Sequence, residues 1–244
     1  MHSRGGDAAR PIAANLSAPV SQTNPVLRAP PVGSAARSLC QRCLRPQRSC
    51  ICQWIAPHTP QVEVLILQHP LEVQQAKGSA RLLHLSLAAS QLVVGEQFAP
   101  EQLAQLLAGP RRNILLYPEM AGEQSLGMAP AQPLDPAWLL QPQQLRLIVL
   151  DGTWRKSRKM LYLNPVLQSL PRLPLKATPP SHYLIRKAHL PDQLSTLEAT
   201  VYALAQLELA PQRYDALIAA FDGFVAQQAA FVPAASPKSH GSGD

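Results

Sequence analysis

Three short apolar runs, separated by helix-like segments, constrain the fold of this chain more than any other feature. They are residues 62–68 (VEVLILQ), 113–118 (NILLYP) and 145–151 (LRLIVLD). Each run is nearly continuous in apolar residues, which is typical of strands that are covered on both faces. Helical patterns occupy residues 76–90, 100–109, 194–209 and 213–232. Because strands alternate with helices, the sequence predicts an α/β fold with a mostly parallel sheet flanked by helices.

A polar or proline-containing turn follows each apolar run. The turns read QHPLE, with His69 and Glu72, then YPEM, and then DGTW, which begins at Asp151. In open α/β sheets, ligands bind at the carboxyl ends of the strands, so we expect the three turns to converge on one pocket. The sequence contains no GxGxxG fingerprint after a strand, no Walker A loop and no GxSxG elbow, which disfavours the common nucleotide-binding and hydrolase sites.

Composition divides the chain of 244 residues into a folded body and two ends. Residues 1–36 and 233–244 are rich in small residues and proline and have no periodic apolar pattern, so we predict that both are disordered. A cysteine-containing segment, residues 37–56, precedes the main domain, residues 57–232. No apolar run approaches the roughly 20 residues that span a membrane, and the N-terminus lacks the apolar core of a secretory signal. We therefore expect a cytoplasmic protein.

All the cysteines of the chain lie within one short segment: Cys40, Cys43, Cys50 and Cys52. A C-x2-C pair and a C-x-C pair are separated by six residues. Four thiolates can form a closed tetrahedral Zn²⁺ site, which normally has a structural role. A reducing compartment favours metal ligands over disulfides. The sequence predicts a structural zinc site, with an iron–sulfur cluster or free thiols as alternatives.

The DGTW turn and the start of a later helix contain candidate site residues. Each residue can have either a functional role or a purely structural one. Asp151 ends a buried strand, where a carboxylate can bind a ligand amine or act as a base, or simply form the turn. Thr153 can cap the next helix, and Trp154 can pack beside a nucleobase or in the core. Ser195 and Glu198 have the spacing of a capping box, and a helix N-terminus also binds anions.

Positive charge is concentrated after the DGTW turn of a chain whose formal net charge is +7. The cluster contains Arg155, Lys156, Arg158 and Lys159. At helical spacing these residues cover more than one face, so the cluster is either a solvated surface or a track for phosphates. Arg186 and Lys187 end a further strand-like piece, YLIRK. A basic surface of this kind favours a polyanionic partner such as nucleic acid.

Taken in order, these motifs resemble the DTW-domain family of tRNA-uridine aminocarboxypropyltransferases. Within that family, the sequence resembles the bacterial branch most. The motifs are the cysteine set, HPLE, LLYP, DGTW with Lys159-Met160, YLIRK and LSTLEA, over roughly residues 38–232. The resemblance implies a SPOUT-like fold, related to knotted RNA methyltransferases. One position departs from the family pattern, because Gly78-Ser79 stands where an Asn-Thr pair is expected.

The resemblance also implies a reaction. S-adenosylmethionine is the expected donor, its 3-amino-3-carboxypropyl chain is transferred to N3 of a uridine in tRNA, and 5′-methylthioadenosine is released. Two rival functions remain: a SPOUT-type methyltransferase that uses the same donor, and a noncatalytic zinc-containing RNA-binding protein. The sequence does not identify the modified uridine, the set of tRNAs or the oligomeric state.

Roles for individual residues follow from this resemblance. The expected catalytic residues are Asp151, Thr153 and Trp154, with Asp151 as the base or as the group that binds the donor's ammonium. The expected donor-binding residues are His69, Glu72, Leu116, Tyr117, Pro118, Ser195, Thr196 and Glu198. Leu116, Tyr117 and Pro118 would form the apolar wall that buries the donor's methyl group. The expected tRNA contacts are Arg155, Arg158, Lys159, Arg186 and Lys187.

Overall fold

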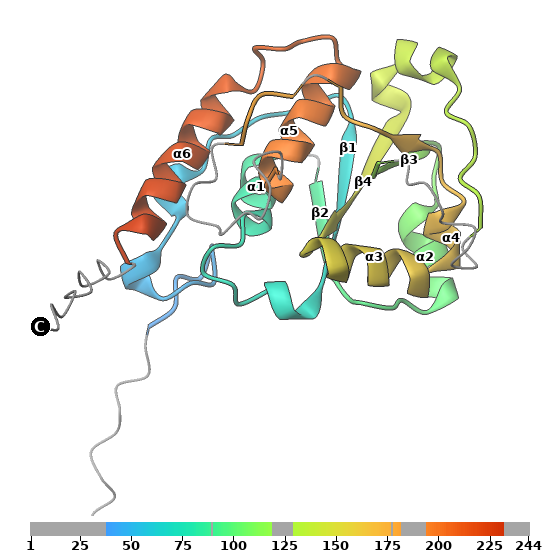
Figure 1. The fold of residues 1–244 in the computed structure, drawn as a ribbon. Coiled ribbons are helices and arrows are strands. Elements are labelled where there is room, and N and C mark those ends of the chain that lie inside the picture. Colours follow the sequence, from blue (N-terminus) through green and yellow to red (C-terminus); the bar gives the residue numbers. More distant parts are fainter. Residues whose placement is uncertain (1–37, 89, 119–128, 177, 182–193, 232–244) are drawn as a thin grey trace, which may run out of the picture. The chain divides into compact units, whose positions relative to one another are not determined.

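A five-stranded parallel sheet lies at the centre of the computed structural model (Figure 1). The strands are β1 (Glu63–Gln68), β2 (Ser90–Val94), β3 (Arg112–Leu116), β4 (Leu145–Asp151) and β5 (Arg172–Leu173), in the spatial order β2-β1-β4-β3-β5. The structure describes residues 38–88, 90–118, 129–176, 178–181 and 194–231. The predicted α/β fold with a parallel sheet is confirmed, whereas the SPOUT-like classification stays a prediction.

Helices cover both faces of the sheet (Figure 1). They are α1 (Ala80–Ser86), α2 (Pro100–Leu107), α3 (Trp154–Leu163), α4 (Pro165–Gln168), α5 (Thr196–Leu207) and α6 (Asp215–Ala229). Short 3-10 helices are η1 (Gln47–Ser49), η2 (Cys52–Trp54), η3 (Pro70–Glu72), η5 (Pro136–Leu140) and η6 (Pro142–Gln144). No described helix is both long enough and apolar enough to span a bilayer.

The central strand β4 shows why its sequence is apolar throughout. All of its residues are buried, and alternate side chains enter two different cores. Leu147 and Val149 pack with α1, α5 and α6, whereas Ile148 and Leu150 pack with α2, α3 and α4. Each buried aliphatic side chain of this kind contributes about 1.5–3 kcal/mol relative to exposure. The continuous apolar run therefore predicted two covered faces correctly.

Strand register brings the carboxyl ends of the central strands to one edge. Gln68 at the end of β1 is paired with Asp151 at the end of β4, and Leu116 of β3 is paired with Val149. The turns that follow β1, β3 and β4 consequently start at the same edge of the sheet. This edge is where a ligand site is expected in an open α/β sheet.

Two strands were missed in the sequence. The helical pattern assigned to residues 76–90 ends earlier, because α1 stops at Ser86 and β2 begins at Ser90. β2 is a half-buried strand at the sheet edge, and β5 has only the two residues Arg172 and Leu173 in a proline-rich segment. Neither produces the continuous apolar signal of a central strand. The strand-like piece at residues 183–187 and the predicted disordered ends lie outside the described residues.

Candidate functional site

A cavity of about 680 Å³ opens at the carboxyl edge of the sheet, beside the ends of β3 and β4. Its lining includes predicted residues from three separate motifs: Leu116, Tyr117, Pro118, Thr153, Trp154, Arg155, Ser195 and Thr196. Apolar residues complete much of the wall: Val149, Leu150, Leu173, Pro174, Leu175, Leu194 and Ala199. The volume lies within the range of about 300–1,000 Å³ that is typical of pockets for small ligands and cofactors.

Trp154 presents an aromatic face at this cavity. Its ring stacks on Tyr117, with 5.2 Å between ring centroids and an interplanar angle of 14°. The guanidinium of Arg172 lies 5.5 Å from the Tyr117 ring centroid. Trp154 itself is 46% exposed, so the alternative of core packing is wrong for this residue. Arg172 did not stand out in the sequence, and the stack that it supports holds the indole in one orientation.

Asp151 lies beneath the cavity wall and joins three elements. Its Oδ1 accepts a hydrogen bond from Thr196 Oγ1 at 2.6 Å, and its Oδ2 accepts from Gln68 Nε2 at 2.8 Å. The residue is 5% exposed and is not among the residues that line the cavity. Hydrogen bonds to a carboxylate are strong, so Asp151 fixes the position of Thr196 at the start of α5. This geometry favours a positioning role over direct proton abstraction.

Thr153 occupies the N-cap position of α3, but its side chain makes no capping hydrogen bond. Its backbone carbonyl accepts from the Ser157 amide at 2.9 Å. The predicted N-cap position of Thr153 is confirmed, but the expected capping hydrogen bond from its side chain is absent. Thr153 also lines the cavity, so the residue belongs to the candidate site.

The start of α5 carries the capping box that the sequence predicts. Ser195 Oγ accepts from the Glu198 amide at 3.1 Å, and a Glu198 carboxylate oxygen accepts from the Ser195 amide at 2.7 Å. Ser181 Oγ donates to the same carboxylate at 2.9 Å. Glu198 is fully buried, so it stabilises the helix start, while Ser195 and Thr196 line the cavity.

Gly78-Ser79 stands where the family pattern has an Asn-Thr pair, and this segment still makes one contact with α5. Ser79 is buried, and its Oγ accepts from the Leu197 amide at 3.2 Å, in the first turn of α5. A threonine would offer the same hydroxyl at this position. At Gly78 the chain has no side chain, and the Gly78 carbonyl accepts from Arg45 Nη2 at 2.9 Å. The substitution therefore removes only whatever contact an Asn side chain would make.

His69 and Glu72, which were predicted to bind the donor, do not line this cavity. His69 Nδ1 accepts from the Leu71 amide at 3.1 Å, so Nε2 carries the hydrogen and donates to Glu96 at 2.9 Å. Glu72 accepts from Lys156 Nζ at 2.7 Å. Each of the two side chains is thus hydrogen-bonded to a residue outside its own turn.

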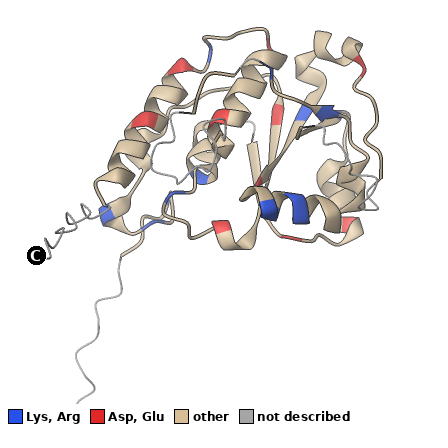
Figure 2. Cartoon of the chain, in the orientation of Figure 1, with Lys and Arg blue, Asp and Glu red and all other residues tan. Residues whose placement is uncertain are grey.

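A second, basic groove of about 990 Å³ lies beside the cavity. It is lined by His69, Pro70, Leu71, Glu96, Arg155, Lys156, Arg158, Lys159 and Tyr162. Lys159 donates to Glu96 at 3.0 Å, and this bond, together with that from His69, lowers the pKa of the Glu96 carboxyl below its usual value. Figure 2 shows the basic residues side by side along α3. Arg186 and Lys187 lie outside the described residues.

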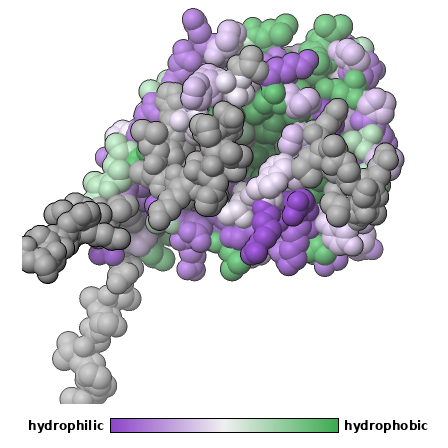
Figure 3. Space-filling model, in the orientation of Figure 1, coloured by the Kyte–Doolittle hydropathy of each residue, from purple (hydrophilic) through white to green (hydrophobic). Residues whose placement is uncertain are grey.

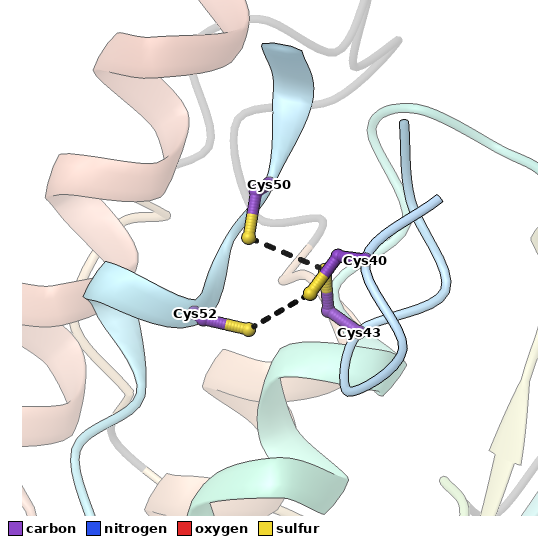
Figure 4. Close-up of side chains that lie close together, drawn as sticks. All are labelled: Cys40, Cys43, Cys50 and Cys52. Atoms are coloured by element: carbon purple, nitrogen blue, oxygen red, sulfur yellow. Dashed lines mark hydrogen bonds between the residues drawn. The ribbon is translucent and has the colours of Figure 1, made fainter. Parts of the chain in front are cut away.

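The cysteine sulfurs converge as a metal site requires (Figure 4). Cys40 Sγ lies 3.6 Å from Cys52 Sγ, Cys43 Sγ lies 3.7 Å from Cys50 Sγ, and all four atoms lie within 4.8 Å of one another. A tetrahedral ion with Zn–S bonds of about 2.3 Å places its sulfurs roughly 3.8 Å apart. The four thiols can therefore hold a metal ion. The backbone amides of Cys43 and Arg42 lower the pKa of the Cys40 thiol to about 6, whereas burial raises the pKa of Cys52 to about 12.

The cysteine knuckle, residues 38–56, packs directly on α6. The Trp54 ring lies against Gly223, where a Cβ atom would overlap the indole. Trp54 Nε1 donates to Gln227 Oε1 at 2.6 Å, and Gln227 Nε2 donates to the Cys50 carbonyl at 3.0 Å. A metal that fixes Cys50 would thereby fix the contact with the last helix of the domain.

The described residues define a parallel α/β protein with a ligand-sized cavity at the carboxyl edge of its sheet and a four-cysteine site. Residues 37–229 match the DTW domain, so the chain belongs to the DTW domain family.

Curated relatives carry one common name, tRNA-uridine aminocarboxypropyltransferase 2. The chain is 31% identical to the Drosophila melanogaster protein over 191 residues, which cover 75% of this chain and 71% of the relative. It is 28% and 29% identical to the Macaca fascicularis and Mus musculus proteins over 178 residues, 70% of this chain and 57% of each relative. No solved structure matches the chain. These relatives are animal proteins, so the closer resemblance to the bacterial branch stays a prediction.

Proposed function

We propose that this protein transfers the 3-amino-3-carboxypropyl group of S-adenosylmethionine to N3 of a uridine in tRNA. The observation that carries the proposal is the convergence of three family motifs on one cavity. LLYP, DGTW and LSTLEA are distant in sequence, and residues of all three line it. The relatives' name supplies the transferred group and the acceptor class. The rival functions are RNA methylation with the same donor and noncatalytic RNA binding.

The cavity offers a suitable group for each part of the donor. The aromatic face of Trp154 suits the adenine, and the N-terminus of α5 at Ser195 and Thr196 suits the donor's carboxylate. Leu116 and Pro118 provide an apolar wall for the methyl group. If the methyl is buried there, the side-chain carbon next to sulfur faces the acceptor, which selects one of three S–C bonds.

The reaction is a single displacement. Uridine N3 attacks the carbon next to the sulfonium, an N–C bond forms, and the C–S electron pair returns to sulfur. Neutral 5′-methylthioadenosine leaves, and the N3 proton passes to solvent. In this scheme Asp151 acts through Thr196, whose hydroxyl it holds at 2.6 Å at the cavity wall. Positioning of this kind accounts for catalysis because the sulfonium is already a good leaving group.

The cysteine knuckle is proposed to hold one structural Zn²⁺. None of its residues lines the cavity, so the metal stabilises the fold and takes no part in the transfer. One zinc and no iron per natively purified chain is the expected metal content. Iron with acid-labile sulfide would instead identify an iron–sulfur cluster. The proposed cellular site of the enzyme is the cytoplasm, where its tRNA substrate is found.

Replacing Trp154 by alanine is expected to raise the Kd of S-adenosylmethionine about 2- to 10-fold, the effect of losing one aromatic stacking partner. Trp154→Phe keeps a ring on Tyr117 and should stay within about 2-fold of the parent protein. Isothermal titration calorimetry in the absence of RNA measures the effect. An unchanged donor Kd, with weaker binding of tRNA instead, would place the acceptor base rather than the adenine on this ring.

By-product analysis tests the proposed function. The protein is incubated with tRNA and S-adenosylmethionine, and the small molecules are separated by chromatography. The proposal requires 5′-methylthioadenosine that forms only when tRNA is present. Formation of S-adenosylhomocysteine would identify a methyltransferase, and tRNA binding without either product or any donor binding would identify a noncatalytic RNA-binding protein.

A further inference from the structure

One face of α3 carries a stripe of three basic residues and an aromatic one. Arg155, Arg158, Lys159 and Tyr162 follow one another at steps of three, one and three residues, which places them on the same side of an α-helix. All of them are exposed, and Tyr162 is 56% exposed. Ser157, Met160 and Leu161 form the buried face of the helix.

The four basic residues of the segment cover more than one face of the helix, as the sequence predicts. Lys156 lies apart from the stripe, since its ammonium is held by Glu72 at 2.7 Å. The other three basic residues share one face. Figure 3 shows hydrophilic side chains gathered over this helix. The stripe is therefore one continuous surface that a single partner can contact.

The stripe forms a side of the basic groove, and the opposite side comes from the turn after β1. Leu71 in that turn is 66% exposed and lines the groove together with Tyr162. Two large apolar side chains thus face a groove whose other residues are mostly charged. Arg155 lines both this groove and the donor cavity, so the two sites meet at its side chain.

Charge in the groove is not fully neutralised by its own acidic residues. Glu72 pairs with Lys156, and Glu96 is shared by Lys159 and His69. Among the residues that the structure describes, no ion pair engages Arg155 or Arg158. Two exposed guanidinium groups are consequently available for phosphate, with which Arg forms bidentate hydrogen bonds.

We propose that this groove binds a single-stranded stretch of RNA next to the acceptor nucleotide, with phosphates at Arg155 and Arg158 and an unpaired base stacked on Tyr162. The inference rests on the proposed function, because N3 lies on the pairing edge of uridine and reacts only in an unpaired nucleotide. Arg155 and Tyr162 are about 10 Å apart along the helix axis. This span matches about three stacked nucleotides at about 3.4 Å each.

Single-stranded RNA fits these residues better than a duplex does. Stacking on an exposed aromatic ring, next to a charged track for the backbone, is the usual way in which proteins bind unpaired strands. Paired bases in a duplex leave no ring face for Tyr162 or Leu71. The groove would hold the strand on one side of the cavity while the acceptor base enters the cavity itself.

Tyr162→Ala and Arg158→Gln test the proposal through the Kd for tRNA, measured without donor. Tyr162→Ala should raise that Kd about 5-fold or more, whereas Tyr162→Phe should stay within about 2-fold. Arg158→Gln should reduce the slope of log Kd against log salt by about 1. Arg112→Gln is the matched charge control, since Arg112 is exposed beside Trp138 at the amino end of β3, and it should leave the Kd unchanged.

Competition identifies the form of the ligand. An unstructured RNA oligonucleotide should displace tRNA more effectively than the same sequence in a duplex, and more effectively than polyglutamate. Equal competition by the duplex or by polyglutamate would overturn the proposal in favour of a simple charged surface.

Different results would contradict the groove assignment and the proposed function. If the parent protein transfers the aminocarboxypropyl group while Tyr162→Ala and Arg158→Gln bind tRNA like the parent, the groove assignment is wrong and the proposed function stands. If both variants weaken tRNA binding as expected but no transfer occurs, the groove is an RNA-binding site and the proposed function is wrong.

Discussion

Replacing Cys43 by serine is expected to abolish binding of the zinc ion proposed for the cysteine knuckle and to lower the melting temperature by about 10 °C. Cys43 is 2% exposed, and its Sγ lies 3.7 Å from that of Cys50. A serine hydroxyl does not replace a thiolate ligand, and the free energy of metal binding at such a site is also folding free energy. A loss of about 3–5 kcal/mol, at about 2–4 °C for each kcal/mol, gives a shift of this size.

Calorimetry together with metal analysis measures the effect of Cys43→Ser. Gln47→Ala is the matched control, because Gln47 lies in the same knuckle but is exposed. It should retain the metal and the melting temperature of the parent protein. A Cys43→Ser protein that melts with the parent, or a parent protein that binds no metal, would contradict the structural role of the knuckle.

Loss of the metal should also weaken donor binding through a defined set of contacts. Arg45 of the knuckle donates to the carbonyls of Ala76 at 2.5 Å and Gly78 at 2.9 Å. The adjacent Ser79 accepts from the Leu197 amide at the start of α5, where the donor's carboxylate is proposed to bind. A loosened knuckle would therefore free the loop that supports this helix start.

Asp151→Ala is expected to lower kcat for transfer about 100-fold or more, while Asp151→Asn should lower it by less than about 10-fold. Alanine leaves Thr196 and Gln68 without their buried acceptor. An Asn side chain can still accept from Thr196, and the Gln68 amide can rotate so that its oxygen accepts from the new amide. Asn therefore preserves the arrangement but cannot take a proton.

The comparison of the two Asp151 variants separates positioning from base catalysis. Loss of a general base removes about 100- to 10,000-fold in rate, and Asn would then be as damaging as Ala. An equal loss of kcat in both variants, with a changed pH profile of kcat, would indicate that Asp151 acts as a base. Retained tRNA binding in both variants shows that the loss lies in the transfer step.

The centre of the fold was predictable from sequence because burial on both faces leaves a strong signal. β1 and β4 lie inside the sheet, and their continuous apolar runs gave their positions to within one residue. The edge strands β2 and β5 were not predictable in this way. β2 is half-buried, and β5 has only two residues.

The candidate site was predictable where local chemistry dictates local structure. The capping box at Ser195 follows from spacing alone, and the structure has it. Gln68 was missed because its partner, Asp151, is set by the pairing of β1 with β4, which the sequence does not reveal. His69 and Glu72 were assigned to the donor site from the family resemblance. Neither residue lines the cavity, and His69 lines the groove beside α3, so their donor contacts stay a prediction.

The most direct measurement uses S-adenosylmethionine labelled in two positions. The protein is incubated with tRNA and either carboxyl-labelled or methyl-labelled donor, and the label retained in tRNA is counted. Transfer of the aminocarboxypropyl group predicts that carboxyl label enters tRNA and that methyl label does not. Methyl label in tRNA, without carboxyl label, would contradict the proposed function.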